Sequence, residues 1–202
     1  MCGRYKLNAR FEDVQKYFDL IDGDTEFEPR DEIFPGTDIF VVKRGRVPTN
    51  VFWTITERDS KGVLRRVINA KSETAHVVPM FRDALRNGRI LIPATGFYEW
   101  KELPDKRKEK YAFEYADPLF AFAGIARKCE VGGKERECGV ILTTEANNVV
   151  REIHTKNRMP VILRREDYEK WLDPETPLDD LKSIMQPVHD DEIKAYQVEK
   201  SK

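Results

Sequence analysis

The chain of 202 residues is 40% hydrophobic and 35% charged, a composition typical of a globular protein that can bury a sizeable core. No apolar run approaches the roughly 20 residues of a membrane span, and the N-terminus lacks the basic and apolar regions of a signal peptide, so we expect a cytoplasmic protein. The net charge of −1 excludes a polycation, but residues 1–165 carry +5 and the acidic residues 166–202 carry −6, which permits a local anion-binding face.

In the N-terminal half, the spacing of apolar residues predicts two helices and four strands. Asn8 is a plausible cap for the first helix, and glycine-containing segments mark the turns. In chain order we expect a helix at 8–20, a loop at 22–30, a strand at 39–43, a turn at 44–46, a strand at 50–56, a turn at 59–62, a strand at 63–69, a helix at 79–86 and a strand at 89–94.

The C-terminal half continues with short strands and short helices. We expect a loop at 103–110, a strand at 110–115, two strands at 119–128 and 137–143 around a double-glycine turn, a helix at 144–153, a strand at 159–163, helices at 165–172 and 177–185, and a strand at 193–198. This mixture favours a single compact α+β domain over residues 1–202, with a mainly antiparallel, barrel-like β-sheet and a few flanking helices.

Three cysteines without a CxxC spacing argue against a disulfide framework or a zinc site. Cys129 and Cys138 flank the double-glycine turn and could face each other across a hairpin. We interpret both as packed thiols in a reduced compartment. The sequence shows no metal-binding or cofactor motif, so we expect neither group.

Cys2 has the most distinctive chemistry in the chain. Removal of Met1 is expected ahead of a small residue, which would leave Cys2 as the mature N-terminus. A terminal cysteine carries an α-amine with a pKa of roughly 7.7–8.0 and a thiol with a pKa of about 8.5. Both nucleophiles are then partly reactive near neutral pH, although a cysteine beside the start codon can also be accidental.

Three other polar residues lie beside apolar strands: Asn69, Glu99 and His154. Glu99 stands among aromatic residues, where partial desolvation raises the pKa of a carboxyl group and suits it to proton transfer. Histidine donates or accepts a proton near neutral pH. Singly, each residue also has a structural interpretation, namely an ion pair for Glu99, a helix end for His154 and a turn for Asn69.

Five ordered motifs resemble the SOS-response-associated peptidase (SRAP) family and span most of residues 1–165. They are Met1-Cys2-Gly3-Arg4-Tyr5, Asn69-Ala70-Lys71-Ser72-Glu73-Thr74, Pro79-Met80-Phe81-Arg82, Ile92-Pro93-Ala94-Thr95-Gly96-Phe97-Tyr98-Glu99-Trp100, and His154 followed by Arg158-Met159-Pro160-Val161-Ile162-Leu163. Residues 29–42 are also similar. The resemblance implies a compact β-rich α+β fold.

The resemblance also implies a sensor of abasic sites in single-stranded DNA, which captures the lesion covalently through the N-terminal cysteine and protects it during the DNA damage (SOS) response. The matching catalytic positions are Cys2, Asn69, Glu99 and His154. The expected product is a thiazolidine, formed when the amine and thiol of one residue bond to the same aldehyde carbon. A transient imine also permits weak lyase activity. We expect a monomer that is associated with the nucleoid when it is bound to DNA.

Residues within or beside these motifs are candidates for DNA contact. Cations would contact phosphates, and aromatic or apolar side chains would stack on bases or wedge the strand. The candidates are Arg4, Lys71, Arg82 and Arg158 for phosphates, and Trp53, Met80, Phe34 and Phe81 for bases, with a core role favoured for Phe34 and Phe81.

This chain departs from the family pattern at three places. Lys71 stands where the family usually has arginine, and lysine lacks the bidentate fork of arginine. The segment between His154 and Arg158 is about two residues longer than is common in the family. A third departure is Trp53-Thr54-Ile55, where Trp-Gly-Leu is common.

Two other functions remain open from the sequence. The first is a cysteine peptidase with Cys2 as nucleophile and His154 as base, although only Met1 precedes Cys2 and we therefore expect no pro-segment to cleave. The second is a non-covalent single-stranded DNA-binding module that uses the basic residues of the body. Covalent capture of abasic DNA would distinguish the function implied by the resemblance from both.

Overall fold

Five strands of the computed structural model, which describes residues 2–58 and 61–198, form a closed ring of hydrogen bonds. They are β12 (Lys134–Glu145), β4 (Val47–Trp53), β3 (Asp38–Lys43), β8 (Arg89–Ala94) and β11 (Phe120–Val131). The ring closes because β12 pairs with both β4 and β11. Closure satisfies edge backbone groups that an open sheet would expose. The predicted α+β fold with a barrel-like sheet is confirmed.

β12 also carries the segments that surround the candidate site. β7 (Asn69–Lys71) runs parallel to β12, and Asn69 lies opposite Ile141. β13 (Arg158–Pro160) runs antiparallel to the same strand, with Arg158 opposite Glu145. β14 (Ile162–Leu163) pairs with β11. Two motifs that are almost 90 residues apart in the sequence are therefore fixed to the same end of one strand.

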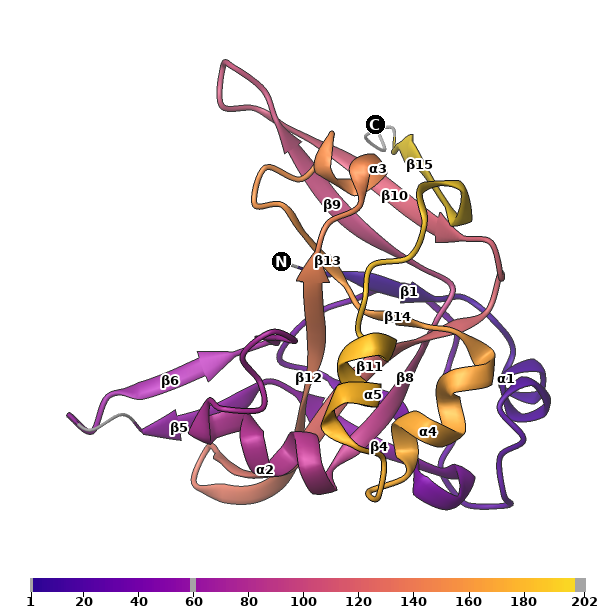
Figure 1. Ribbon diagram of the computed structural model, residues 1–202, viewed down its shortest axis with the longest axis vertical. Coiled ribbons are helices and arrows are strands. Elements are labelled where there is room, and N and C mark those ends of the chain that lie inside the picture. Colours follow the sequence, from indigo (N-terminus) through magenta and orange to yellow (C-terminus); the bar gives the residue numbers. More distant parts are fainter. Residues whose placement is uncertain (1, 59–60, 199–202) are drawn as a thin grey trace.

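A second, antiparallel sheet covers one side of the ring (Figure 1). Its strands, in spatial order, are β15 (Ile193–Gln197), β10 (Lys108–Tyr115), β9 (Gly96–Glu102), β1 (Tyr5–Leu7) and β2 (Arg30–Ile33). Phe97 on β9 contacts Phe122 on β11, with 6.1 Å between ring centroids. Tyr5 on β1 contacts the ring of Phe122 at 5.8 Å. These buried rings form the core between the two sheets.

The helices of the described residues are α1 (Phe11–Tyr17), α2 (Pro79–Asn87), α3 (Asn148–Arg151), α4 (Tyr168–Leu172) and α5 (Leu178–Ile184), with 3-10 turns η1 (Arg44–Arg46), η2 (Arg165–Asp167) and η3 (Asp190–Glu192). Four of these five helices are shorter than the sequence predicts, whereas α2 extends one residue beyond the predicted helix at 79–86. The predicted helix at 144–153 is wrong in its first half, because residues 144–145 extend β12 to pair with β13. The proposed cap Asn8 is also wrong: its side-chain amide donates to Asp31, and Arg10 precedes α1.

Several predicted strands differ from those observed. The strand predicted at 50–56 is divided into β4 and β5 (Ile55–Arg58), and the strand at 63–69 into β6 (Leu64–Val67) and β7. The strand at 159–163 is divided into β13 and β14. β1, β2 and β9 were not predicted as strands. The predicted turn at 44–46 is confirmed as η1, whereas the turn at 59–62 includes residues 59–60, which lie outside the described residues.

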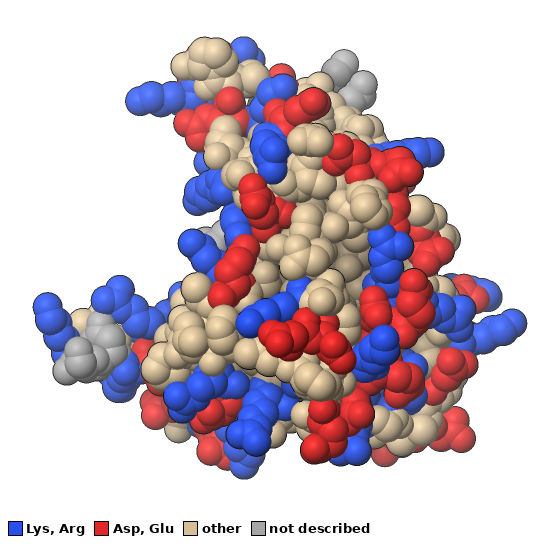
Figure 2. All heavy atoms as spheres, viewed as in Figure 1, with Lys and Arg blue, Asp and Glu red and all other residues tan. Residues whose placement is uncertain are grey.

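Two hairpins project from the body of the molecule (Figure 1). One is formed by β5 and β6, which among the described strands pair only with each other, and the other by the outer ends of β9 and β10. β13 lies between these hairpins in Figure 1. In Figure 2, Lys and Arg side chains gather on the β5–β6 projection at the lower left, whereas the upper projection carries both basic and acidic side chains. The two projections give this side of the molecule a concave outline (Figure 2).

The acidic C-terminal segment is part of the fold. Arg89 at the start of β8 is buried, and its guanidinium donates to the carbonyl oxygens of Leu85 and Trp171 at 2.6 and 2.5 Å. The Trp171 indole in turn donates to the carbonyl oxygen of Ile90 at 3.0 Å. These hydrogen bonds hold α4 against the barrel. Among the described residues, none of the helices combines the length and apolar character needed to cross a membrane.

The interpretation of Cys129 and Cys138 as reduced thiols is wrong, because the structure joins them in a disulfide. Cys129 lies opposite Arg136 across the β11–β12 hairpin, and Cys138 lies opposite Arg127. The hairpin register therefore brings the two Cα atoms to 6.0 Å, within the range that a disulfide spans. Cysteine spacing alone does not reveal this register.

We expect the double variant Cys129→Ser, Cys138→Ser to have a free energy of unfolding lower by about 2–3 kcal/mol, because the disulfide closes a short loop in the unfolded chain. Urea unfolding without reductant measures the difference. As a direct check, a maleimide should label only Cys2 in the unfolded, unreduced protein, and all three cysteines after reduction. Labelling of three cysteines without reductant would contradict the disulfide.

Candidate active site

Four predicted site residues are buried polar or thiol groups, although they come from four separate segments. Cys2 precedes β1, Asn69 begins β7, Glu99 lies in β9, and His154 follows α3. The exposed fractions are 0% for Cys2, 3% for Glu99 and 6% for His154, and Asn69 is also buried. Burial of a carboxyl group and an imidazole costs free energy unless each has partners, so their partners define the site.

Glu99 and His154 are direct partners. The Nε2 atom of His154 lies 3.4 Å from the Oε2 atom of Glu99. The other ring nitrogen, Nδ1, lies 2.9 Å from the carbonyl oxygen of Arg158. A carbonyl accepts but cannot donate, so Nδ1 carries a proton and Nε2 is the atom that exchanges a proton with Glu99.

Burial sets the protonation of this pair. It raises the pKa of Glu99 from its usual 4.5 to about 7. It also lowers the pKa of His154, an effect that the hydrogen bond to the Arg158 carbonyl opposes. Near neutral pH the imidazole is therefore largely neutral, while Glu99 exists in both protonated and ionised forms. A carboxyl group in that state can act as an acid or as a base.

A pocket of about 480 Å³ opens onto the Glu99–His154 pair. It is lined by Ile68, Glu99, Trp100, Glu102, Lys108, His154, Thr155 and Lys156. The field of Lys156 acts on both titrating groups and favours a lower pKa for each. Sequence reasoning missed Trp100, Lys108 and Lys156 as site residues, because nothing in the local sequence shows that these segments meet.

Cys2 lies within electrostatic reach of Glu99. Burial raises the pKa of the Cys2 thiol, and the Glu99 carboxylate raises it further. The Sγ atom lies 3.7 Å from the carbonyl oxygen of Arg4. In this state the sulfur is a protonated thiol, and it becomes a good nucleophile only if a neighbouring group accepts its proton.

Asn69 adjoins the pocket through its neighbour Ile68. Both polar atoms of its side chain are buried, and neither has a hydrogen-bond partner among the described residues. An unsatisfied buried amide costs roughly 1–3 kcal/mol. This cost is typical of a residue kept for binding or catalysis rather than for stability.

Two of the predicted phosphate contacts are already engaged within the protein. Arg158 is only 15% exposed and forms a two-bonded ion pair with Glu73 at 2.6 and 2.8 Å. Arg4 pairs with Glu32 at 3.0 Å, and its guanidinium lies against the rings of Phe34 and Trp100. Contact with a phosphate would require these two arginines to exchange or share partners.

The other predicted cations are on the surface. Lys71 is exposed at the end of β7, and Arg82 is exposed on α2, where it pairs with Asp83 at 3.3 Å. Exposed ion pairs of this kind contribute little and break easily. The role of both residues in DNA binding stays a prediction.

The predicted base contact by Trp53 is wrong. Its side chain is fully buried, its indole donates to the carbonyl oxygen of Ile68 at 2.9 Å, and its ring contacts Tyr5. No face of the ring is open to a base. The core role predicted for Phe81 is confirmed, whereas Phe34 is exposed beneath Arg4. Met80 is half-buried in the first turn of α2, and its contact with DNA stays a prediction.

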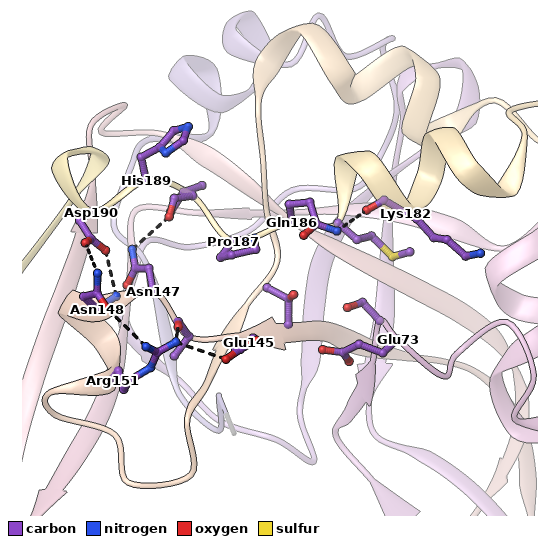
Figure 3. Close-up of a pocket in the computed structure, with 15 residues that line it drawn as sticks. Glu73, Glu145, Asn147, Asn148, Arg151, Lys182, Gln186, Pro187, His189 and Asp190 are labelled. Carbon is purple, nitrogen blue, oxygen red and sulfur yellow. Dashed lines mark hydrogen bonds and ion pairs between the residues drawn. The ribbon is translucent and has the colours of Figure 1, made fainter.

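A larger pocket, of about 780 Å³, lies elsewhere (Figure 3). It lies where the end of β12 meets α3 and the segment after α5, and many of its polar groups bond to one another. Asp190 accepts from Asn148, and Arg151 donates to Glu145. It holds no pair comparable to Glu99 and His154 among its described lining residues, so we place the chemistry in the smaller pocket.

Comparison with known proteins gives a consistent picture. The family model described as SOS response associated peptidase (SRAP) matches residues 1–201. The abasic site processing protein YoqW of Bacillus subtilis (strain 168) is 34% identical over 216 residues, which cover 98% of this chain and 92% of that protein. The abasic site processing protein YedK of Escherichia coli (strain K12) is 28% identical over 183 residues, covering 85% and 79%.

Solved structures share the fold. A protein from Bacteroides thetaiotaomicron, 23% identical, has a TM-score of 0.86 and covers 98% of this chain and 92% of its own. A phage-related protein from Bordetella bronchiseptica, 28% identical, has a TM-score of 0.78 and covers 98% and 95%. Similarity therefore extends over nearly the whole chain.

The raised pKa of Glu99 predicts a pH-dependent stability. The folded state holds this proton more tightly than the unfolded chain, so ionisation of Glu99 opposes folding. The penalty is absent below about pH 4.5, grows as the pH rises and reaches about 3 kcal/mol above pH 7. We expect Glu99→Gln to remove this penalty. The free energy of unfolding of the variant, relative to that of the unaltered protein, should therefore increase between about pH 4.5 and 8.

Urea unfolding at several pH values measures this difference. Glu175→Gln, at a solvent-accessible position after α4, is the control. Its free energy of unfolding should depend on pH in the same way as that of the unaltered protein. A Glu99→Gln curve that also runs parallel would show that the carboxyl group does not titrate in this range.

Proposed function

Because the chain belongs to the SOS response associated peptidase family, we propose that it captures abasic sites in single-stranded DNA by bonding covalently to them through Cys2. The observation that carries this proposal is the buried Glu99–His154 pair beside the Cys2 thiol. The names of its relatives, which are abasic site processing proteins, support abasic DNA as the substrate.

The first step is to open the sugar ring. An abasic deoxyribose exists mainly as a closed hemiacetal, which must lose its hydroxyl proton and gain a proton on the ring oxygen to become an aldehyde. In this proposal Glu99 and His154 move these two protons, which is supported by the raised pKa of Glu99 and the lowered pKa of His154. Proton transfer of this kind contributes roughly 10²- to 10⁴-fold to a rate.

The second step forms two bonds at the aldehyde carbon. Once the residue ahead of Cys2 has been removed, the free α-amine adds to the aldehyde, and loss of one water leaves an imine. The thiol then adds across the C=N bond, so that sulfur bonds to carbon and nitrogen gains a proton. The product is a five-membered thiazolidine.

The buried thiol needs a base for this addition, because its pKa is raised. Glu99 in its ionised form is the candidate, since it already lies within electrostatic reach of Cys2. With amine and thiol on one residue, the second bond forms in an intramolecular reaction with a high effective concentration. The imine also permits β-elimination, in which loss of the C2′ proton expels the 3′ phosphate, so weak strand cleavage is part of the proposal.

Asn69 has a positioning role in this scheme. Its buried amide carries both a donor and an acceptor without partners among the described residues. The α-amine of a processed Cys2 would supply a partner, and an oriented lone pair on that amine favours attack on the aldehyde.

The peptidase alternative is less well supported. A peptidase thiol acts as a thiolate, usually with a lowered pKa and a histidine as its base. Here burial raises the pKa of Cys2, and the carboxyl group of Glu99 faces Nε2 of His154. This arrangement suits the capture of an electrophile better than peptide cleavage.

The central test is incubation with a single-stranded oligonucleotide containing one abasic site, followed by a denaturing gel. We expect a heat-stable protein–DNA band with the processed protein, and no such band with Cys2→Ala. A protein that keeps a fused N-terminal tag should also fail, because its Cys2 amine is an amide. An undiminished band from either altered protein would overturn the thiazolidine mechanism.

Asn69→Ala separates function from stability. We expect the free energy of unfolding to change by less than about 1 kcal/mol, because the lost contacts are offset by removal of an unsatisfied amide. The rate of capture should fall by about tenfold or more, since a misplaced nucleophile reacts slowly.

Asn147→Ala is the matched control. This second buried asparagine is bonded at both ends of its amide, accepting from the Val150 amide and donating to the Val188 carbonyl. Its loss should lower the free energy of unfolding by about 1 kcal/mol or more. Equal destabilisation by both variants would make Asn69 a structural residue.

A further inference from the structure

The turn that follows His154 is well fixed. The Asn157 amide donates to the His154 carbonyl at 3.0 Å, and the Asn157 carbonyl accepts from the Ala146 amide at 3.1 Å. Arg151 donates to the side-chain oxygen of Asn157 at 2.7 Å. Asn157 has a φ of 54°, a backbone conformation that asparagine tolerates better than most residues. Lys156 is therefore held in place at its backbone, although its side chain is exposed.

Lys156 shares its pocket with a second lysine from a different element. Lys108, at the start of β10, lines the same 480 Å³ pocket as Lys156, Glu99 and His154. Both lysines are exposed, and the structure records no ion pair for either within residues 2–58 and 61–198. This contrasts with Arg4 and Arg158, which are paired with carboxylates.

The two ammonium groups outnumber the exposed carboxylate at this rim. Glu102 lines the same pocket and lies opposite Lys108 across the β9–β10 hairpin. One carboxylate against two lysines leaves a net positive rim. Lys156 also acts electrostatically on Glu99 and His154, so a group bound by this rim would lie beside the pair.

We propose that Lys108 and Lys156 form a phosphate-binding subsite at the mouth of the Glu99–His154 pocket, which holds a phosphodiester next to the abasic sugar. This inference rests on the proposed function and deepens it. Lysine is a compact point charge that binds phosphate without demanding a fixed geometry. Phosphate contacts fix the register of a nucleic acid strand, so this subsite would set which sugar reaches the pocket.

The subsite also explains why the arginines in the motifs need not be the phosphate contacts. Arg158 holds Glu73 and the Thr143 carbonyl, and so it fixes β13 and the carbonyl to which His154 donates. Lys108 and Lys156 can bind an anion without breaking such contacts. Exposed cations of this kind lose only their hydration and side-chain freedom when they bind a phosphate.

The test uses a single-stranded oligonucleotide with a tetrahydrofuran analogue of the abasic site, which lacks the aldehyde and cannot crosslink. Fluorescence anisotropy over a series of salt concentrations gives both the affinity and its salt dependence. Lys156→Gln and Lys108→Gln should each weaken binding about 3- to 10-fold and reduce the salt slope by about 0.7. Lys156→Arg should restore both, because it keeps the charge.

Lys16→Gln is the matched control, since it removes the same charge from an exposed position on α1. It should leave the affinity and the salt slope unchanged. If Lys156→Gln and Lys108→Gln behave like Lys16→Gln, the subsite is wrong.

A second experiment identifies the ligand group. A neutral methylphosphonate replaces the phosphodiester on either side of the analogue, one at a time. At one of the two positions, the methylphosphonate should weaken binding by the unaltered protein about as much as Lys156→Gln weakens binding to the unmodified oligonucleotide. The same methylphosphonate should weaken binding by the Lys156→Gln variant only slightly further. An equal loss for both proteins at both positions would overturn the proposal.

Capture of aldehyde-containing DNA by the unaltered protein is measured in parallel. Failure of that reaction would overturn covalent capture, whereas the titrations with the analogue would still decide whether the lysines bind phosphate. The two proposals therefore fail by different measurements.

Discussion

The candidate site depends on the burial of one carboxyl group against one imidazole. Glu99 is almost completely removed from solvent, and its pKa rises to about 7 because the ionised form is poorly solvated. His154 is fixed in one orientation by the carbonyl of Arg158 and faces Glu99 with its other nitrogen. Such an arrangement lowers stability when Glu99 ionises. It is retained, in our interpretation, because a carboxyl group with this pKa transfers protons at neutral pH.

The barrel supplies the rigidity that this pair requires. β12 belongs to the closed ring, and its C-terminal end binds β7 on one side and β13 on the other. Asn69 and Arg158 are therefore held by one strand, and the ion pair from Arg158 to Glu73 connects the two segments again. Glu99 comes from the second sheet, where it lies on β9. Asn69 and Glu99 thus lie on strands, and a site built on strands is positioned more precisely than one built on loops.

Two groups of positively charged residues near the candidate site have different roles. Arg4 and Arg158 lie in the motifs, but they are partly buried and paired with Glu32 and Glu73. Their principal effect is to hold the elements that carry the site. Lys108 and Lys156 at the pocket of the Glu99–His154 pair are instead exposed to solvent. The acidic C-terminal segment offsets the positive charge of residues 1–165 in the total, which gives the net charge of −1.

Sequence alone determined the fold class and the identity of Cys2, Asn69, Glu99 and His154 as candidates, because ordered motifs and residue chemistry are local properties of the chain. Only the tertiary structure decided which groups meet. Three features depend on strand register and on contacts between distant segments. They are the burial of Trp53, the disulfide between Cys129 and Cys138, and the approach of Lys156 to Glu99. The sequence did not predict β1 and β9 for a related reason: pairing with neighbouring strands, which the sequence does not show, holds them extended.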